Sequence, residues 1–416
     1  MQKTKLESAE NQKFTLYQIF LIALLAVLQF TVLLGFSIIS PLGDIMMKDL
    51  DIDTAQFGLL ISGYAFGAGF SGLLVASVAD RYDRKTFLLF FYAGFLAGLF
   101  LCGIARSFPL LLVSRTVTGI FGGVISSISM SIVADTFPLN HRGRVMGYVQ
   151  MAFTVSQIAG IPLGLLIANR WGWNANFLAI TAIGIITGVV IKVKMKPLRE
   201  HLKYIRESKN AWRHLLHLLT EKKYFAGYAL ITLTSVGGAM LMPFSAPFLI
   251  NNVGVTQEQL PFLYMITGIA GVFIMIYTGK ISDRFPKKNV FLAGTVVSII
   301  MTVIFTNLTP VALWVVVVVN ILLFIGINGR FVPSMALNTA VPKPEDRGGY
   351  MSLCSAMQQF SNGVGSLVAG LVIFQPVKSG PLYYFDAVGY IVCVVTVICV
   401  FLVYRVARQV SALEEA

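Results

Sequence analysis

The chain has 416 residues, of which 56% are hydrophobic and only 12% are charged, and it carries a net charge of +13. Its mean hydropathy of +0.77 excludes a soluble globular protein, because such a protein has about twice this share of charged residues and cannot bury this much apolar surface. The composition is instead that of a protein with many membrane-spanning segments.

The apolar residues fall into runs that are long enough to cross a membrane. A helix needs about 20 apolar residues to span the hydrocarbon core. Twelve runs meet this requirement, and several contain Gly and Pro, which membrane helices tolerate. The predicted spans are residues 15–40, 55–79, 86–105, 109–134, 144–168, 174–192, 224–250, 258–279, 289–306, 310–336, 348–374 and 382–404.

The distribution of Lys and Arg predicts the orientation of these spans. If the N-terminus is cytoplasmic, 26 of the 32 Lys and Arg residues lie in cytoplasmic segments and 4 in outer loops. Basic residues are enriched on the cytoplasmic side of membrane proteins. We therefore predict that both termini are cytoplasmic, and that the positive charge serves topology and contact with membrane lipid rather than with nucleic acid.

A charged hairpin at residues 80–85 joins the second and third spans, and a similar one at residues 282–288 joins the eighth and ninth. Asp80 and Asp283 are 203 positions apart, so the chain is predicted to consist of two similar halves. The predicted boundaries are 1–192 for the N-terminal six-helix bundle, 193–223 for a cytoplasmic linker and 224–416 for the C-terminal bundle. Leu, Ile and Trp recur at helical spacing in the linker, which predicts one or two amphipathic helices there.

Polar and charged residues inside the spans are candidates for a central substrate cavity, because burying them in hydrocarbon is costly. Each also has a structural alternative: Arg115 could bond backbone carbonyls, Arg330 could reach the inner interface, and the amides could join helices without contacting substrate. Arg330 has no basic counterpart in the first half, where Ser126 stands. The cavity candidates are Gln29, Tyr64, Arg115, Gln157, Asn328, Arg330, Gln358 and Asn362.

Three stretches form motifs of a known family: the charged hairpin up to Lys85, Arg115 with Gly119 and Gly123, and the run from Gly160 to Gly164. Through them the chain resembles the major facilitator superfamily over nearly its whole length, and within it bacterial drug-proton antiporters and sugar-efflux permeases of the arabinose-efflux type. Gly72 to Lys85 is similar to the loop motif between helices 2 and 3 of that family. Arg115 with Gly119 and Gly123 matches its helix 4 motif, although Thr118 stands where Gln is common. The run from Gly160 to Gly164, with Pro162 at its centre, is similar to the helix 5 motif associated with antiporters.

The resemblance implies an all-α membrane protein, with twelve transmembrane helices in two pseudo-symmetric six-helix bundles that rock about a central site. Asp80 is predicted to meet the start of helix 11 and an Arg such as Arg142 only when the inner side is closed. The candidates for control of this gating are Asp80, Arg81, Arg84, Arg142, Asp283, Arg284, Gly160, Pro162 and Gly164.

Many such exporters carry a carboxylate in helix 1, around the position that Gly35 occupies here. If transport is coupled to protons, the proton must bind elsewhere, and the carboxylates at or inside helix ends are Asp386, Asp135 and Asp44. Partial burial would raise the pKa of such a group toward the physiological range, and Asp386 is the best placed of the three.

The predicted function is proton-coupled efflux of a small molecule (a drug, sugar or metabolite) by a monomer in the bacterial inner membrane. The alternatives are a proton-independent facilitator or importer of a polar or anionic metabolite, and a transport-inactive sensor or scaffold. No nucleotide loop, nucleophile–base pair or metal-ligand spacing is found in the sequence. We therefore predict no enzyme activity, no cofactor and no metal.

Overall fold

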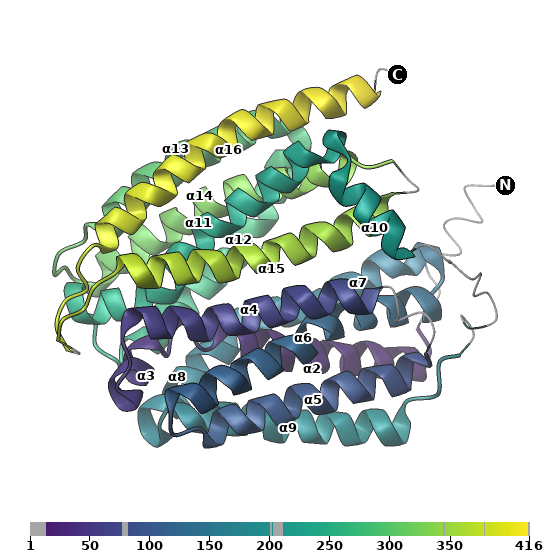
Figure 1. Cartoon of the computed structure of the whole chain (residues 1–416), viewed down its shortest axis with the longest axis horizontal. Helices are drawn as coiled ribbons and strands as arrows, with labels where there is room; N and C mark the ends of the chain where they lie inside the picture. Colours follow the sequence, from purple (N-terminus) through teal and green to yellow (C-terminus); the bar gives the residue numbers. More distant parts are fainter. Residues whose placement is uncertain are drawn as a thin grey trace.

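The computed structural model describes residues 14–76, 82–199, 202, 211–343, 346–377 and 379–414. In this part of the chain the structure is built from long helices that run roughly side by side (Figure 1). The N-terminal half forms one layer and the C-terminal half the other, and both termini lie at the same end of the molecule. We call this the termini end, and the opposite end, which carries the short helix α3, the α3 end.

The N-terminal half contributes six spanning segments and the short helix between the first two. Its helices are α2 (Leu16–Ser37), α3 (Gly43–Leu50), α4 (Thr54–Ala76), α5 (Arg84–Ile104), α6 (Phe108–Thr136), α7 (Leu139–Val155), α8 (Ile161–Trp171) and α9 (Trp173–Lys194). A π-helical turn, Ser156–Gly160, connects α7 to α8 within a single span. Pro162 explains this turn, because proline has no N–H to donate and so interrupts the α-helical bonding of the preceding turn.

The C-terminal half repeats the arrangement. Its helices are α11 (Phe225–Phe248), α12 (Leu260–Arg284), α13 (Lys287–Thr306), α14 (Leu313–Ala340), α15 (Arg347–Val372) and α16 (Phe385–Glu414). Helix α11 contains Pro243 and Pro247 and continues into a second π-helical turn, Leu249–Val253.

The predicted twelve-helix fold is confirmed. Eleven segments of the described chain are long and apolar enough to cross a membrane, and α15 supplies a further helix of 26 residues. Two features differ from the prediction: α16 continues ten residues beyond the expected end at 404, and α3 occupies a loop where no helix was expected.

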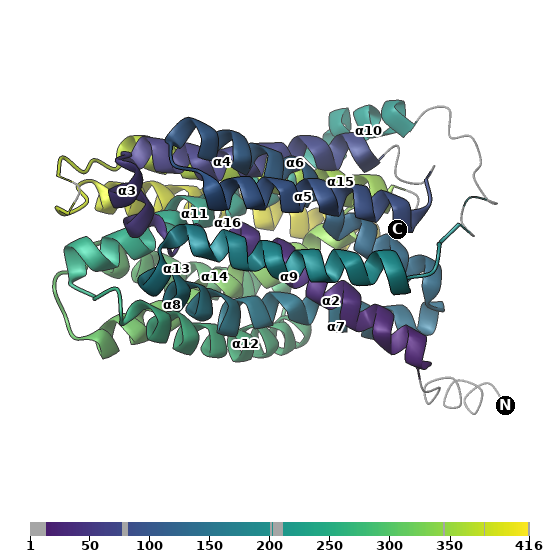
Figure 2. The same ribbon diagram turned by 90° about the horizontal axis from the view of Figure 1, so that it is seen from below.

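One helix of the predicted linker lies within the described residues. Helix α10 (Ala211–Thr220) lies at the termini end, beside the C-terminal half (Figure 2). Its Leu215 and Leu218 are buried, and a Cβ on Gly349 of α15 would lie 2.6 Å from Leu218 Cδ1. The amphipathic helix is therefore packed against protein on its apolar side. Residues 203–210 lie outside the described part of the chain.

The two halves are in close contact from the α3 end to Phe70 of α4 and Phe360 of α15. Close to that end, a Cβ on Gly58 of α4 would lie only 2.6 Å from Ser366 O of α15. Further along, the Ser62 hydroxyl donates to Gly363 O (2.7 Å), and the rings of Phe70 and Phe360 meet edge to face with centroids 4.8 Å apart. Small residues on both helices permit this close approach.

Buried apolar residues show the same asymmetry between the two ends. One buried cluster includes residues of both halves, such as Phe57 of α4 and Phe244 of α11, whose rings meet edge to face at the α3 end. A second cluster at the termini end is made of linker and C-terminal residues. Among the described residues of the N-terminal half, Leu73 packs against it. The shared core therefore closes one end of the interface between the halves.

Candidate functional site

Arg115 lies at the centre of the N-terminal half, where α6 meets α2 and α4. Its side chain is fully buried, its Nη1 donates to Gly35 O (2.8 Å), and its guanidinium carbon lies 4.8 Å from the centroid of the Tyr64 ring. A Cβ on Gly119 would lie only 2.1 Å from Tyr64 O, so α6 and α4 pack closely here. Within the described chain, Nε and Nη2 of Arg115 have no hydrogen-bond partner.

This arrangement gives a buried cation one backbone contact and leaves two of its N–H groups available. Gly35 of α2 supplies the backbone carbonyl. The structural alternative for Arg115, bonding to a carbonyl of α2, is therefore present. An unpaired buried donor is costly, and the predicted place of Arg115 in a substrate cavity stays a prediction.

A second polar contact joins α2 to α6. Gln29 is buried, and its Nε2 donates to Ser126 Oγ (2.7 Å), while its Oε1 has no partner in the described chain. Ser126 is thus a neighbour of Gln29 that sequence reasoning noted only as the counterpart of Arg330.

The helix 5 motif lies where that span contacts both halves. A Cβ on Gly160 would lie 2.9 Å from Leu34 of α2, and one on Gly164 would lie 2.5 Å from Ile38. On the other side of the π-helical turn, a Cβ on Gly268 of α12 would lie 3.0 Å from Gln157 O. The motif therefore combines a deformable turn with close contact to α12, and a role in gating remains a prediction.

The hydrogen bonds found for the amide candidates of the C-terminal half lie within their own helices. Asn328 is half-buried and donates to Phe324 O of its own helix (2.9 Å). Gln358 and Asn362 are half-buried on α15, and Asn362 is 3.4 Å from Gln359 Oε1. Their predicted role in a central site stays a prediction.

Arg330 lies inside the C-terminal half, away from the polar residues of α2, α4 and α6. Its side chain is buried, Nη1 donates to Ser298 Oγ of α13 (3.3 Å), and the guanidinium carbon lies 5.8 Å from the Phe291 centroid. Cys399 of α16 is another neighbour, so Arg330 is held between α13 and α16. The structure gives it no contact with the N-terminal half among the described residues.

Asp44 forms a polar cluster that joins the two halves at the α3 end. Its carboxylate is 1% exposed and accepts hydrogen bonds from Lys48 (2.9 Å), Asn251 (2.6 Å) and Gln257 (2.6 Å). Asn251 and Gln257 belong to the C-terminal half, in and just after the π-helical turn of α11. We call these four residues the Asp44 cluster.

The sequence places Asp44 at the end of the first span but gives no sign of this pairing. Its partners Asn251 and Gln257 lie more than 200 residues away, and no short motif links them to Asp44. Neighbouring hydrogen bonds also cross between the halves at this end, from Ser40 to Met242 O (2.7 Å) and from Thr54 to Ile373 O (2.7 Å).

At the termini end, the described part of the charged hairpin is tied to its own half. Arg84 is buried, and its Nε lies 3.0 Å from the carboxylate of Asp135 at the end of α6. Burial raises the pKa of Asp83, but hydrogen bonds from Arg199 and nearby backbone amides outweigh it, so this pKa lies below its usual range. Arg142 donates to Phe137 O (2.9 Å). Asp80 and Arg81 lie outside the described residues.

The remaining charged candidates lie near helix ends. Asp283 and Arg284, in the last turn of α12, are exposed. Asp386 is half-buried in the first turn of α16, and no hydrogen-bond partner is found for its carboxylate in the described chain. Asp386 therefore has the position of a helix-start acid, where the helix dipole favours negative charge.

Comparison with known proteins identifies the family. A profile of the Major Facilitator Superfamily matches residues 25–342 and 227–415. The chain is 27% identical to the uncharacterized MFS-type transporter YtbD of Bacillus subtilis (strain 168), over 79% of this chain and 82% of that protein. It is 26% identical to a probable sugar efflux transporter of Helicobacter pylori (strain ATCC 700392 / 26695), over 88% and 90% of the two chains.

A solved structure shows the same fold at low identity. The crystal structure of a bacterial homolog to the human lysosomal transporter Spinster, in an inward-facing and unoccupied conformation, superposes with a TM-score of 0.77 at 17% identity, covering 96% of this chain and 99% of that one. Together with the twelve-helix architecture, the profile match shows that the chain belongs to the Major Facilitator Superfamily and is a multi-pass membrane transporter.

Proposed function

We propose that the protein exports a small polar molecule, a sugar or a related metabolite, across the bacterial inner membrane, and that export is coupled to protons. The relatives named as sugar efflux transporters, which match nearly the whole chain, support the substrate class and direction. The helix 5 motif around Pro162 supports export as well, because it resembles the motif associated with antiporters.

The observation that carries the mechanism is the one-sided contact between the halves. Cross-half hydrogen bonds from the Asp44 cluster, Ser40, Thr54 and Ser62 lie at the α3 end or in the adjoining part of α4. In the orientation predicted from Lys and Arg, this end faces outward, so the structure corresponds to an inward-open state. Breaking these contacts while the halves close at the termini end would give the outward-open state.

A transport assay tests the proposal. The purified protein in liposomes should exchange internal and external radiolabelled sugar, and a pH gradient should drive accumulation above equilibrium. A panel of sugars at two pH values identifies the substrate. Exchange that proceeds at the same rate and to the same level at all pH gradients would contradict proton coupling and favour the facilitator. The absence of a carboxylate from residues 14–41 is the observation that favours this alternative.

Asp44 does not fit the role of the coupling site, because its ionised form stabilises the conformation that the protonated carrier of an antiporter has to adopt. Its ionised carboxylate stabilises closure of the α3 end, which is the inward-open state in the proposed orientation. In a proton antiporter the protonated carrier is the one that must return to the inward-open state after releasing substrate outside. Asp135 is already paired with Arg84. Asp386 is therefore retained as the proposed proton site.

We expect Asp386→Asn to reduce pH-driven accumulation at least tenfold while leaving substrate exchange within about twofold of wild type. The reason is that an amide of similar size cannot bind and release the proton. Glu258→Gln is a matched control, since Glu258 is an exposed acid in the loop before α12. Equal pH-driven accumulation by Asp386→Asn and wild type would remove Asp386 from the mechanism.

Orientation is tested by cysteine labelling in a variant whose four native Cys residues are replaced. Ser379→Cys, beside the α3 end, should react in intact cells with a reagent that cannot cross the membrane. Ser411→Cys, near the end of α16, should react only after the cells are opened. The reverse pattern would invert the proposed topology and the direction of transport inferred from it.

A further inference from the structure

The C-terminal half carries a basic groove on its outer surface at the termini end. Its volume is about 640 Å³, and its walls come from α13 (Lys287 and Lys288), α14 (Ala336, Leu337 and Ala340) and α16 (Tyr404, Ala407, Arg408, Val410 and Ser411). A second hollow of about 570 Å³ adjoins it along α16 and shares Tyr404 and Arg408. We call the two together the basic groove.

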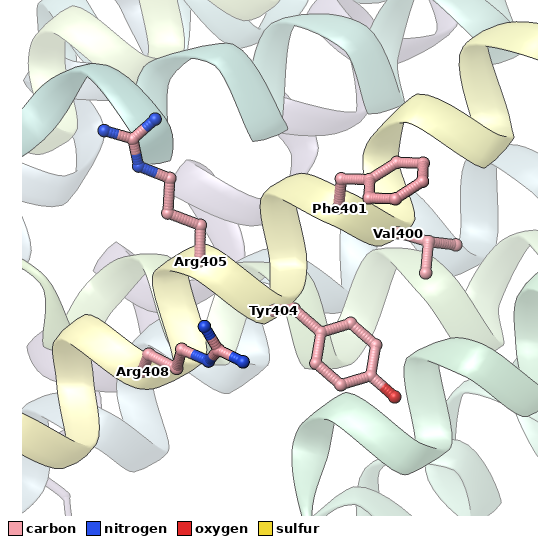
Figure 3. A pocket seen from close by; sticks show the side chains of 5 residues that line it. All are labelled: Val400, Phe401, Tyr404, Arg405 and Arg408. Atoms are coloured by element: carbon pink, nitrogen blue, oxygen red, sulfur yellow. The ribbon is translucent and has the colours of Figure 1, made fainter.

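The charged lining of this groove is all of one sign. Arg405 extends away from α16, while Arg408 lies across the helix ribbon with its guanidinium toward Tyr404 (Figure 3). Both Arg residues and Lys288 are exposed, and Lys288 Nζ lies 6.0 Å from the Tyr404 centroid. None of the described residues that line the groove is a carboxylate, so its cations attract anions without internal competition.

An apolar ridge leads along α16 to these cations. Val394, Ile398 and Phe401 are exposed by 61%, 44% and 73%, on the surface that a spanning helix presents to lipid. Phe401 and Arg408 are seven residues apart, or about 10 Å along the helix. The headgroup layer of a bilayer is roughly 5–8 Å thick on each side, so the ridge and the cations match the acyl and phosphate levels of one lipid.

We propose that the basic groove binds an anionic phospholipid, with its phosphate between Arg408 and Lys288, which line the same hollow, and its acyl chains along the ridge that ends at Phe401. Arg405, in the adjoining hollow, adds to the positive charge around the phosphate. Arg is suited to a phosphate because its N–H groups can donate to two oxygens at once. Tyr404 lies between charged and apolar residues, as aromatic residues do at membrane interfaces. Because α13, α14 and α16 all line the groove, the bound lipid would connect three helices of the C-terminal half.

Native mass spectrometry of the full-length protein in detergent, titrated with phosphatidylglycerol or phosphatidylcholine, tests the site. We expect a clear preference for phosphatidylglycerol. The double variant Arg405→Gln/Arg408→Gln should lose roughly 25-fold in affinity for this lipid, about fivefold for each cation removed near the membrane surface. Its affinity for phosphatidylcholine should remain within about twofold of wild type.

The matched control is Lys192→Gln/Lys194→Gln. These two Lys residues lie in the last turn of α9, are exposed at the same end of the molecule, and carry the same charge without belonging to the groove. Equal losses for the control and for the Arg405/Arg408 variant would show general attraction to a positive surface and overturn the proposed site. An absence of lipid preference in the wild type would do the same.

A second double variant removes the cations on the α13 side of the groove. Lys287→Gln/Lys288→Gln should also weaken phosphatidylglycerol binding, although α16 is unchanged. Size-exclusion profiles and melting temperatures establish that each variant is folded, and this second pair decides the question if the α16 variant is unstable. Unchanged affinity in the folded Lys287/Lys288 variant would exclude a shared groove. A third result would exclude a lipid as the ligand: inorganic phosphate displaces phosphatidylglycerol, and the affinity does not depend on the length of the acyl chains.

Discussion

Asp44→Asn is expected to shift the transporter from closure at the α3 end toward opening at that end. The substitution keeps the size of the side chain but replaces one carboxylate oxygen with an NH₂ group, which cannot accept the hydrogen bond that Asn251 donates to Oδ1 or the one that Gln257 donates to Oδ2. A hydrogen bond to a charged group contributes about 1.5–3 kcal/mol, so losing about 2 kcal/mol would change the population ratio roughly 30-fold. Lys48 would also lose its ion-pair partner.

Pulsed electron resonance can measure this shift between spin labels on the two halves. Trp171, at the end of α8, and Trp314, at the start of α14, are 69% and 70% exposed and accept labels without disturbing the core. The distance distribution should gain a longer population in Asp44→Asn. Since the shift disfavours the inward-open state, substrate affinity measured from the inside should fall as well.

Asp49→Asn provides a control on the same short helix. Asp49 accepts a hydrogen bond from Trp173 Nε1 (2.6 Å), so its partner belongs to its own half. This variant should leave the distances between the halves unchanged. If both variants open the α3 end equally, the effect comes from destabilising α3, and the Asp44 cluster has no special part in closure.

The second large effect is expected from Arg115. Arg115→Met should lower kcat/KM for sugar exchange by roughly 10–150-fold, which corresponds to about 1.5–3 kcal/mol for a charged hydrogen bond. The substitution removes the contact with Gly35 O and the two N–H groups that have no partner in the described chain, which we expect to meet the substrate. Arg115→Lys should recover little of this activity, because an ammonium group lacks the fixed fork of guanidinium donors.

Arg330→Met is the matched control for a buried cation. Arg330 also has Nε and Nη2 without partners in the described chain, but it lies between α13 and α16. We expect kcat/KM to change less than threefold. If kcat/KM falls as far as it does in Arg115→Met, the effect is a general one: removing a buried cation from either half impairs folding or the movement of that half. A selective rise of KM for anionic substrates in Arg330→Met would instead support its predicted place in the substrate cavity.

The sequence predicted the helices well because the bilayer imposes a simple physical requirement. A span must be long and apolar, and the charged hairpins at 80–85 and 282–288 mark where helices end. The end of α16 was missed because Arg405 and Arg408 lower the hydropathy without ending the helix. Helix α3 was missed because a short helix in a loop has no membrane-length signal.

The candidate site was predictable as a set of residues but not as an arrangement. Arg115 could be identified because a cation in an apolar span is unusual, and its contact with an α2 carbonyl was one of two foreseen possibilities. The direction of Arg330 could not be foreseen, because α14 is apolar around most of its surface and its pattern does not fix the rotation of the helix. The Asp44 cluster depends on residues from two halves, and their pairing is a property of the folded state.

The polarity of α15 has a consequence for the biogenesis of the protein. Although α15 has 26 residues, it is not among the described helices that are apolar enough to qualify as spans by themselves, because it contains residues such as Arg347, Gln358 and Asn362. Insertion from the translocon depends on the hydrophobicity of each emerging helix. Helix α15 packs against α4 and α11, which are synthesised long before it. Its entry into the bilayer therefore depends on a partly assembled transporter, and helix insertion is coupled to tertiary folding at this late step.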